Sequence, residues 1–328
     1  MRAFVTGGAG FIGGALVRRL RGRGDEVHAL ARSAASVQTL RELGCEIAEG
    51  DMGSVEALTG AMHGCDAAFH LAGDYRVGIA ARDRPAMYAA NVTGTANVLD
   101  AAVAAGVPRT VYTSTGNAFG ATGYRVVDET YRRPRPYRYI SYYDETKHLA
   151  HLAAEEQIAA GAPVIIVQVM GVYGPNDHSE LGGVLRQAAA GTLAAITFGD
   201  AGMNLVHVDD VAEGLLLAHD RGHVGETYVL GGEIVTVREA VKRVAAVAGR
   251  RPPRLETPTW LLRAVSPLGG IIGPALAGRP NLRELISASA GVTYWASDAK
   301  ARRELGYAPR DLETGLRQVF GAGEDSRG

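Results

Sequence analysis

The chain has 328 residues, of which 47% are hydrophobic and 21% are charged, and its formal net charge is −1. This composition is that of a folded protein with a full core, long enough for one large domain or two. The near-neutral charge excludes the basic surface of a nucleic-acid-binding protein. Cys45 and Cys65 lack metal-ligand or redox spacing, and no signal peptide precedes the first strand-like run, so we expect reduced thiols and a cytoplasmic location.

A glycine-rich turn stands between the first strand-like run and the first amphipathic helix. Residues 2–6 are β-prone, Gly7, Gly10 and Gly13 follow at three-residue spacing, and residues 11–21 have helical periodicity. Gly7 permits a tight turn, Gly10 lets the backbone approach a pyrophosphate, and Gly13 lets the helix pack closely on the sheet. Free N–H groups at the start of the helix would face the anion. The pattern therefore predicts a dinucleotide site.

Strand-like and helical runs alternate through the first half of the chain. Strands are expected at residues 2–6, 26–31, 46–49, 67–71, 110–114 and 164–170. Helices are expected at residues 11–21, 55–62, 85–105 and 141–160. This order predicts an α/β fold with a doubly wound parallel sheet.

The alternation loosens beyond about residue 175. A helix at residues 208–219, a strand at 227–230 and a helix at 237–249 are expected there. Arg251-Pro252-Pro253 then opens an irregular region, because neither proline can continue a helix or a central strand.

The chain is expected to divide into two parts. Residues 1–175 form mainly a dinucleotide-binding domain, and 176–320 mainly a smaller α/β substrate lobe at the carboxyl edge of the sheet, with 204–230 returning to the first domain. Residues 321–328 are expected to be a disordered tail. Residues 261–278 are apolar but broken by prolines and glycines, so they are too interrupted to span a membrane. We expect them to form an apolar wall of the substrate pocket, with a lipid-facing patch as the alternative.

Tyr143 and Lys147 lie four residues apart in the expected helix at 141–160, so they share one of its faces. An ammonium beside a phenol lowers the pKa of the phenol toward working pH, which suits proton exchange with a carbonyl or an alcohol. Alone, this spacing is common on solvated helix faces. However, the strand that ends in Ser114 and Thr115 places two hydroxyls at the carboxyl edge of the sheet, where such folds bind ligands.

Taken together, the motifs resemble those of the extended short-chain dehydrogenase/reductase family, also described as the NAD-dependent epimerase/dehydratase family. The matching motifs occur in the family's order along nearly the whole chain. They are Thr6-Gly-Gly-Ala-Gly-Phe-Ile-Gly13, Gly50-Asp51-Met52, His70-Leu71-Ala72-Gly73, Asn91-Val92-Thr93-Gly94-Thr95, Tyr112-Thr113-Ser114-Thr115, Tyr143-x-x-x-Lys147 and Val172-Tyr173-Gly174-Pro175. Within the family, the chain is most similar to dihydroflavonol-reductase-like proteins and to the hopanoid-associated sugar-epimerase-like group.

The resemblance implies a role for each matching residue. Tyr143 would be the general acid/base, and Lys147 would lower its pKa and hold the nicotinamide ribose. Thr115 would bond the substrate oxygen, with Ser114 as the alternative, and Asn91 would hold the backbone and a water behind Lys147. No metal site is expected. The expected cofactor-binding residues are Gly7, Gly10, Phe11, Ile12, Gly13, Arg32, Asp51, Met52, Leu71, Ala72, Gly73, Thr113, Tyr143, Lys147, Val169 and Met170.

The charge at the end of the second expected strand favours NADP over NAD. Sites that prefer NAD place a carboxylate there, on the ribose 2′-hydroxyl. Here residues 26–31 are followed by Arg32 and Ser33, and a cation suits a 2′-phosphate. The alternative is that Arg32 is only a solvated loop residue.

The resemblance predicts an NADP-dependent oxidoreductase that transfers a hydride between nicotinamide and a carbonyl or secondary alcohol. Two alternatives stay open: a nucleotide-sugar epimerase with tightly held NAD, and a non-catalytic nucleotide-sensing protein. The chain departs from the family at Gln168-Val169-Met170-Gly171, where many members carry a proline. It departs again at Thr115-Gly116-Asn117, where sugar dehydratases carry Thr-Asp-Glu, so sugar dehydration is not expected.

Partners are predicted from the same patterns. The basic loop at residues 132–138 is either a solvated loop or a holder of a substrate phosphate or carboxylate. The partner is expected to be a small-molecule carbonyl or alcohol, with no nucleic acid and no membrane span. Relatives commonly dimerise through the helices expected here at 85–105 and 141–160, so we expect a homodimer.

Overall fold

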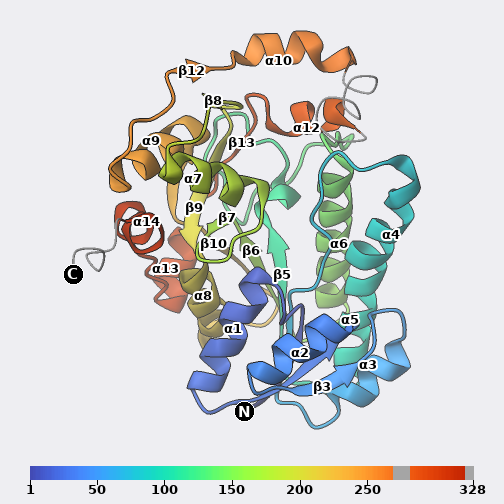
Figure 1. The fold of residues 1–328 in the computed structure, drawn as a ribbon. Coiled ribbons are helices and arrows are strands. Elements are labelled where there is room, and N and C mark those ends of the chain that lie inside the picture. The colour runs from blue at the N-terminus through green and yellow to red at the C-terminus, as the bar shows by residue number, and fades with distance from the viewer. Residues whose placement is uncertain (269–280, 322–328) are drawn as a thin grey trace, which may run out of the picture.

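A seven-stranded sheet forms the centre of the molecule (Figure 1). The computed structural model describes residues 1–268 and 281–321, and the strand order is β10-β6-β5-β4-β1-β2-β3. Every neighbouring pair is parallel, so the expected α/β fold with a doubly wound parallel sheet is confirmed. The strands are β1 (Arg2–Thr6), β2 (Glu26–Ala31), β3 (Glu46–Glu49), β4 (Ala67–His70), β5 (Thr110–Thr115), β6 (Val164–Val169) and β10 (Thr227–Leu230).

Helices cover both faces of this sheet because its strands are buried on both sides. Successive side chains of β1 show the two cores: Val5 packs in the cluster that contains Leu16, and Phe4 packs in the cluster that contains Leu58. One face carries α1 (Phe11–Gly22), α2 (Ala34–Glu42) and α8 (Val208–Arg221), and the other carries α3 (Val55–Met62), α5 (Gly94–Ala104) and α6 (Tyr142–Ala159).

The helix α2 was not expected from the sequence. It begins at Ser33, whose hydroxyl accepts a hydrogen bond from the Ser36 N–H at 3.2 Å, and its Leu40 is fully buried against the sheet. The serine is an ordinary N-cap, so this start signal was readable in the sequence.

The single helix expected at residues 85–105 is interrupted. The chain forms α4 (Arg84–Tyr88), then a π-helical turn over Ala89–Thr93, and only then α5. The buried residue of the turn is Asn91, and π turns often occur at functional sites.

A smaller group of elements extends beyond the carboxyl ends of the parallel strands (Figure 1). In it β9 pairs with β11, β13 and β7, and β8 pairs with β12. Its strands are β7 (Gly171–Tyr173), β8 (Ala195–Ile196), β9 (Gly202–His207), β11 (Glu233–Thr236), β12 (Leu255–Glu256) and β13 (Thr293–Tyr294). The remaining helices are α7 (Glu180–Ala190), α9 (Val237–Val247), α10 (Thr259–Val265), α12 (Leu282–Ser289), α13 (Ala299–Leu305) and α14 (Leu312–Phe320).

The segment expected to return to the first domain, 204–230, is shared between the two sheets. β9 belongs to the smaller sheet through His207, whereas α8 packs on the large sheet and β10 extends it beside β6. The return therefore begins at Val208.

Two expectations fall wholly or partly outside the described residues. Of the apolar segment 261–278, the structure describes the end of α10 and a short 3-10 turn over Ser266–Leu268, and the rest lies outside the described residues. The expected tail likewise lies outside them from residue 322. Within the described ranges, no helix is long and apolar enough to cross a membrane, and no group of three or more His, Cys, Asp or Glu could hold a metal ion.

Candidate active site

The glycine turn after β1 leaves the start of α1 free to bind an anion. Gly7 has φ +74°, and a Cβ there would lie 2.7 Å from the Ala72 nitrogen, while a Cβ on Gly13 would run into the Gly7 carbonyl oxygen. α1 has no side-chain cap and no acidic residue in its first turn. Its N–H groups therefore suit the pyrophosphate of a dinucleotide, and the residues present fit that cofactor.

A buried hydrogen-bond chain connects this turn to Asn91. The Thr6 hydroxyl lies 2.7 Å from His70 Nδ1, and His70 Nε2 lies 3.0 Å from the Thr95 hydroxyl. Because Thr95 donates its proton to the Asn91 carbonyl at 2.7 Å, His70 must donate from Nε2 and accept at Nδ1. Burial lowers the pKa of His70 to about 3, so the ring is neutral. The hydrogen bonds therefore all donate in the same direction, from Thr6 toward Asn91.

Asn91 fixes the segment that follows β4. Its side-chain oxygen accepts from the Asp74 N–H at 2.6 Å, and its amide donates to the Asp74 carbonyl at 2.9 Å and to the Thr146 hydroxyl at 3.0 Å. The side chain is buried, and it joins the Asp74 backbone to α6. Asn91 therefore holds the backbone at Asp74 in place. Its partner on α6, Thr146, stands one residue before Lys147.

Tyr143 and Lys147 project from the first turns of α6 into one cavity of about 630 Å³. The helix begins at Ser141, whose hydroxyl accepts from the Asp144 N–H at 3.0 Å. The Lys147 ammonium donates to the Thr113 carbonyl at 3.4 Å. The cavity brings together most of the residues expected to bind cofactor and substrate. They are Gly7, Gly10, Phe11, Ile12, Gly13, Leu71, Gly73, Asn91, Thr113, Ser114, Thr115, Tyr143, Lys147, Val169 and Met170.

The expected lowering of the Tyr143 pKa is absent in this structure. Burial raises the pKa of the phenol, the neighbouring Tyr75 raises it further, and a hydrogen bond with the Thr115 side chain opposes the rise. The Lys147 ammonium lies against the Thr113 carbonyl and 5.4 Å from the centre of the Tyr112 ring. Burial is the largest of these effects, so the pKa of Tyr143 lies above its ordinary value.

The two hydroxyls at the end of β5 have different partners. Ser114 Oγ lies 3.1 Å from His151 Nδ1 on α6, whereas the Thr115 hydroxyl donates to the Asn117 side chain at 3.2 Å. Successive residues of a strand point to opposite faces, so only one of the two can share a face with Tyr143. The hydrogen bond between Thr115 and Tyr143 makes Thr115 the better placed of the two.

Four of the expected cofactor-binding residues do not line this cavity: Arg32, Asp51, Met52 and Ala72. Arg32 is exposed after the last residue of β2 and has no ion-pair partner in the described ranges. Asp51 accepts from the Gly53 N–H at 2.8 Å. Arg32 and Asp51 therefore lie on open surface.

The basic loop before α6 contains a buried ion pair. Arg133 donates to both carboxylate oxygens of Asp144 at 2.7 Å, and its guanidinium lies 4.6 Å from the centre of the Tyr139 ring. The Asp144 side chain is fully buried and also accepts from the Ile140 N–H at 3.0 Å. Of the two interpretations of this loop, neither describes Arg133, which holds the start of α6 through Asp144. The sequence analysis missed Asp144, although it stands next to Tyr143.

The sequence analysis also missed α12, which forms one wall of the cavity with Leu285, Ala288 and Ser289. Glu284 connects this helix to α6, because its carboxylate accepts from the Tyr142 N–H at 2.7 Å. No local sequence signal could have shown this contact, because the two residues are 142 positions apart.

Comparison with known proteins identifies the family. Residues 3–231 match the NAD dependent epimerase/dehydratase family. The chain belongs to this family. A ketoreductase of Stigmatella aurantiaca, named for 4-hydroxy-2-methyl-3-oxo-4-farnesyl-3,4-dihydroquinoline-1-oxide, is 33% identical and aligns with 99% of this chain and 98% of its own length. A 2-alkyl-3-oxoalkanoate reductase of Stenotrophomonas maltophilia is 29% identical, over 97% of this chain and 98% of its own.

Family members of known structure share the fold along the whole chain. The crystal structure of gox2253 has a TM-score of 0.82 at 32% identity and covers 97% of this chain and 96% of its own. The dTDP-glucose 4,6-dehydratase DesIV of Streptomyces venezuelae, solved with NAD bound, has a TM-score of 0.76 at 25% identity and covers 98% and 96%. The protein is therefore an NAD(P)-dependent enzyme of the extended short-chain type, as the resemblance predicted.

Proposed function

We propose that this enzyme is an NADP-dependent oxidoreductase that interconverts an apolar ketone and its secondary alcohol, with Tyr143 as general acid/base. One observation carries the proposal: a single cavity contains the start of α1, the Tyr143 side chain and a largely apolar wall from the smaller lobe. Among the described lining residues from 176 onward, two are carboxylates, Asp177 and Glu180, and none is a lysine or arginine. Large apolar side chains such as Phe198 and Leu285 lie among them.

This wall favours a reductase over a nucleotide-sugar epimerase. An epimerase must hold the diphosphate of its substrate, and buried phosphates are bound by arginine, lysine or helix N-termini. The described part of the wall offers no cation, whereas an apolar chain or ring would be desolvated there at little cost. The Stigmatella and Stenotrophomonas relatives are named for apolar oxo compounds, which supports the same class of substrate.

Residues in the cavity would donate the proton and position the oxygen that receives it. When bound, the nicotinamide supplies the hydride that adds to the carbonyl carbon. Tyr143 donates its proton to the carbonyl oxygen as the π electron pair moves onto that oxygen, and Thr115 positions the oxygen with a hydrogen bond. The Lys147 ammonium, on the same face of α6, stabilises the phenolate that remains until it takes a proton from solvent.

Cofactor choice is proposed from Arg32. Its exposed guanidinium at the carboxyl end of β2 would pair with the 2′-phosphate of NADP, and NAD offers no such group. We also propose a cytoplasmic homodimer that forms through α5 and α6, which pack side by side on one face of the sheet (Figure 1). Sedimentation velocity would test the dimer.

A decisive experiment starts with protein purified without added cofactor. Mass spectrometry should find the site empty, and NADPH oxidation should then depend on an added aryl or long-chain ketone. Co-purified NAD, together with turnover of a nucleotide sugar, would instead identify an epimerase.

A further inference from the structure

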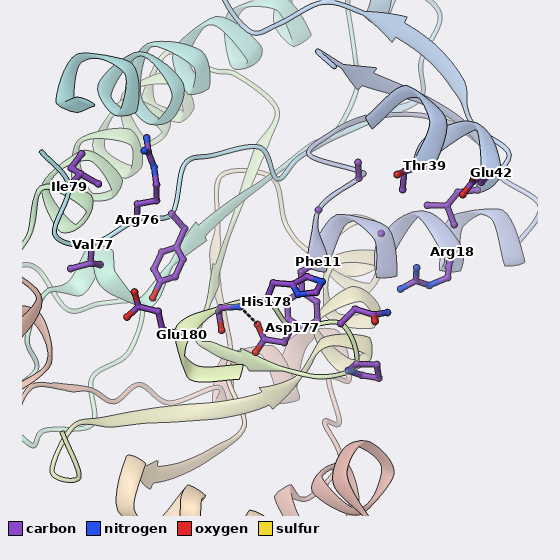
Figure 2. A pocket seen from close by; sticks show the side chains of 18 of the residues that line it. Phe11, Arg18, Thr39, Glu42, Arg76, Val77, Ile79, Asp177, His178 and Glu180 are labelled. Carbon is purple, nitrogen blue, oxygen red and sulfur yellow. Dashed lines mark hydrogen bonds between the residues drawn. The ribbon is translucent and has the colours of Figure 1, made fainter. Parts of the chain in front are cut away.

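Tyr75 stands between the substrate cavity and a second, outer cleft. The outer cleft has a volume of about 910 Å³ and is bordered by α1, α2 and two segments, 75–83 and 175–180 (Figure 2). In Figure 2, Val77 and Glu180, from these two segments, lie on one side of the view, and Arg18 and Thr39 of the two helices lie on the other. Tyr75 lines both the cleft and the cavity.

The ring of Tyr75 lies directly against the catalytic tyrosine. The two ring centres are 4.8 Å apart and the rings are nearly perpendicular, at 80°. Several described residues line both the outer cleft and the substrate cavity. Among them, Tyr75 is the one whose ring contacts Tyr143. It is also 59% exposed, so much of the ring surface is open to these spaces.

The backbone on both sides of Tyr75 is held in place. Asn91 binds the Asp74 N–H and carbonyl, and Arg76 forms an ion pair with the Asp74 carboxylate. Three residues after Tyr75, the Gly78 carbonyl accepts from the Asn281 N–H at 3.2 Å, which fixes the segment to the start of α12. An exposed aromatic ring on a backbone anchored at both ends has a defined position.

We propose that Tyr75 is a specificity-determining residue, whose ring separates the substrate cavity from the outer cleft and limits the size of the group next to the reacting carbonyl. This inference rests on the proposed function, because the carbonyl must approach Tyr143. Truncation of the ring joins the 630 Å³ cavity to the 910 Å³ cleft and makes room for larger groups.

The test compares two ketones, acetophenone and 2-acetylnaphthalene, by kcat/KM with NADPH. Tyr75→Ala should raise the ratio of kcat/KM for the larger ketone over the smaller by about tenfold or more, as pocket reshaping does. Tyr75→Phe keeps the ring and should keep the wild-type ratio. Tyr88→Ala is the matched control, since Tyr88 is 42% exposed and lines neither space. NADPH affinity, measured by fluorescence, should be the same in all four proteins.

Each outcome decides the inference. An unchanged ratio in Tyr75→Ala, or the same change in Tyr88→Ala, overturns it. Should the wild type reduce neither ketone, the proposed function fails, and calorimetric binding of both ketones to the NADP⁺-loaded proteins then decides the role of Tyr75. If only Tyr75→Ala binds 2-acetylnaphthalene more tightly relative to acetophenone than the wild type does, the role is supported. If the ratio of the two affinities is the same in all four proteins, or if none of them binds either ketone, the role is overturned.

Discussion

At the scale of single residues, Tyr143 is proposed to donate the proton and Arg32 is proposed to select the cofactor. Burial and the neighbouring Tyr75 raise the pKa of Tyr143 above its ordinary value. Arg32, the residue proposed to select the cofactor, is exposed after β2 and lines no part of the cavity that contains Tyr143. The two residues should therefore affect different measured quantities.

Replacing Tyr143 with Phe removes the proton donor and little else. We expect kcat to fall by about 100-fold or more, which is the usual contribution of a general acid, while NADPH affinity changes less than about threefold. The neighbouring Tyr142→Phe is the control and should keep normal turnover. Steady-state kinetics and a fluorescence titration provide both numbers, and a Tyr143→Phe enzyme with near-normal kcat would refute the mechanism.

Arg32→Asp should reverse or abolish the preference for NADPH. A charge-assisted hydrogen bond to phosphate contributes about 1.5–3 kcal/mol, so the ratio of the two cofactor affinities should change by about tenfold to a hundredfold. Arg82→Asp makes the same charge change at another exposed site and should leave the ratio unchanged. If the wild-type protein binds NADH more tightly than NADPH, Arg32 does not select the cofactor.

At the scale of elements, the helix α6, which carries Tyr143 and Lys147, is held in place by residues outside it. The Arg133–Asp144 ion pair holds the loop before its first turn, and Glu284 of α12 accepts a hydrogen bond from its first residue. α12 also supplies part of the apolar wall, so the Glu284 carboxylate connects that wall to the helix that carries Tyr143.

Glu284→Ala should therefore damage substrate binding more than cofactor binding. It leaves the Tyr142 N–H without its acceptor and releases α12 from α6, so we expect KM for the ketone to rise by about tenfold with NADPH affinity unchanged. Glu284→Gln keeps an acceptor oxygen and should be close to wild type. The control is Glu313→Ala, which removes an exposed carboxylate on α14. Equal losses in ketone KM and NADPH affinity would argue for general destabilisation instead.

At the scale of the whole molecule, the free energy of unfolding should depend on pH through His70. Burial lowers the pKa of His70 to about 3, whereas in the unfolded chain it lies near 6.5. Below about pH 6.5 the unfolded chain therefore binds a proton that the folded protein does not. His70 should reduce stability by up to about 1.4 kcal/mol per pH unit as pH falls from about 6.5 toward 3.

Urea unfolding at several pH values between 7 and 5 measures this dependence. His70→Gln should show a shallower loss of stability with falling pH than the wild type. The exposed His178→Gln should retain the wild-type slope, because its ring is solvated in both states. Parallel curves for wild type and His70→Gln would exclude His70 as the source.

The sequence by itself determined the features whose causes are local. Gly7 and Gly13 mark the dinucleotide turn because a Cβ would collide there, and the strand and helix order follows from hydrophobic periodicity. The Tyr143 and Lys147 pair was readable because a four-residue spacing places both on one helix face. Only the tertiary structure decided what depends on distant neighbours: the ring of Tyr75 against Tyr143, the contact of Glu284 with α6, and the raised rather than lowered pKa of Tyr143. Burial and long-range contacts are properties of the assembled chain, so no local pattern of residue types records them.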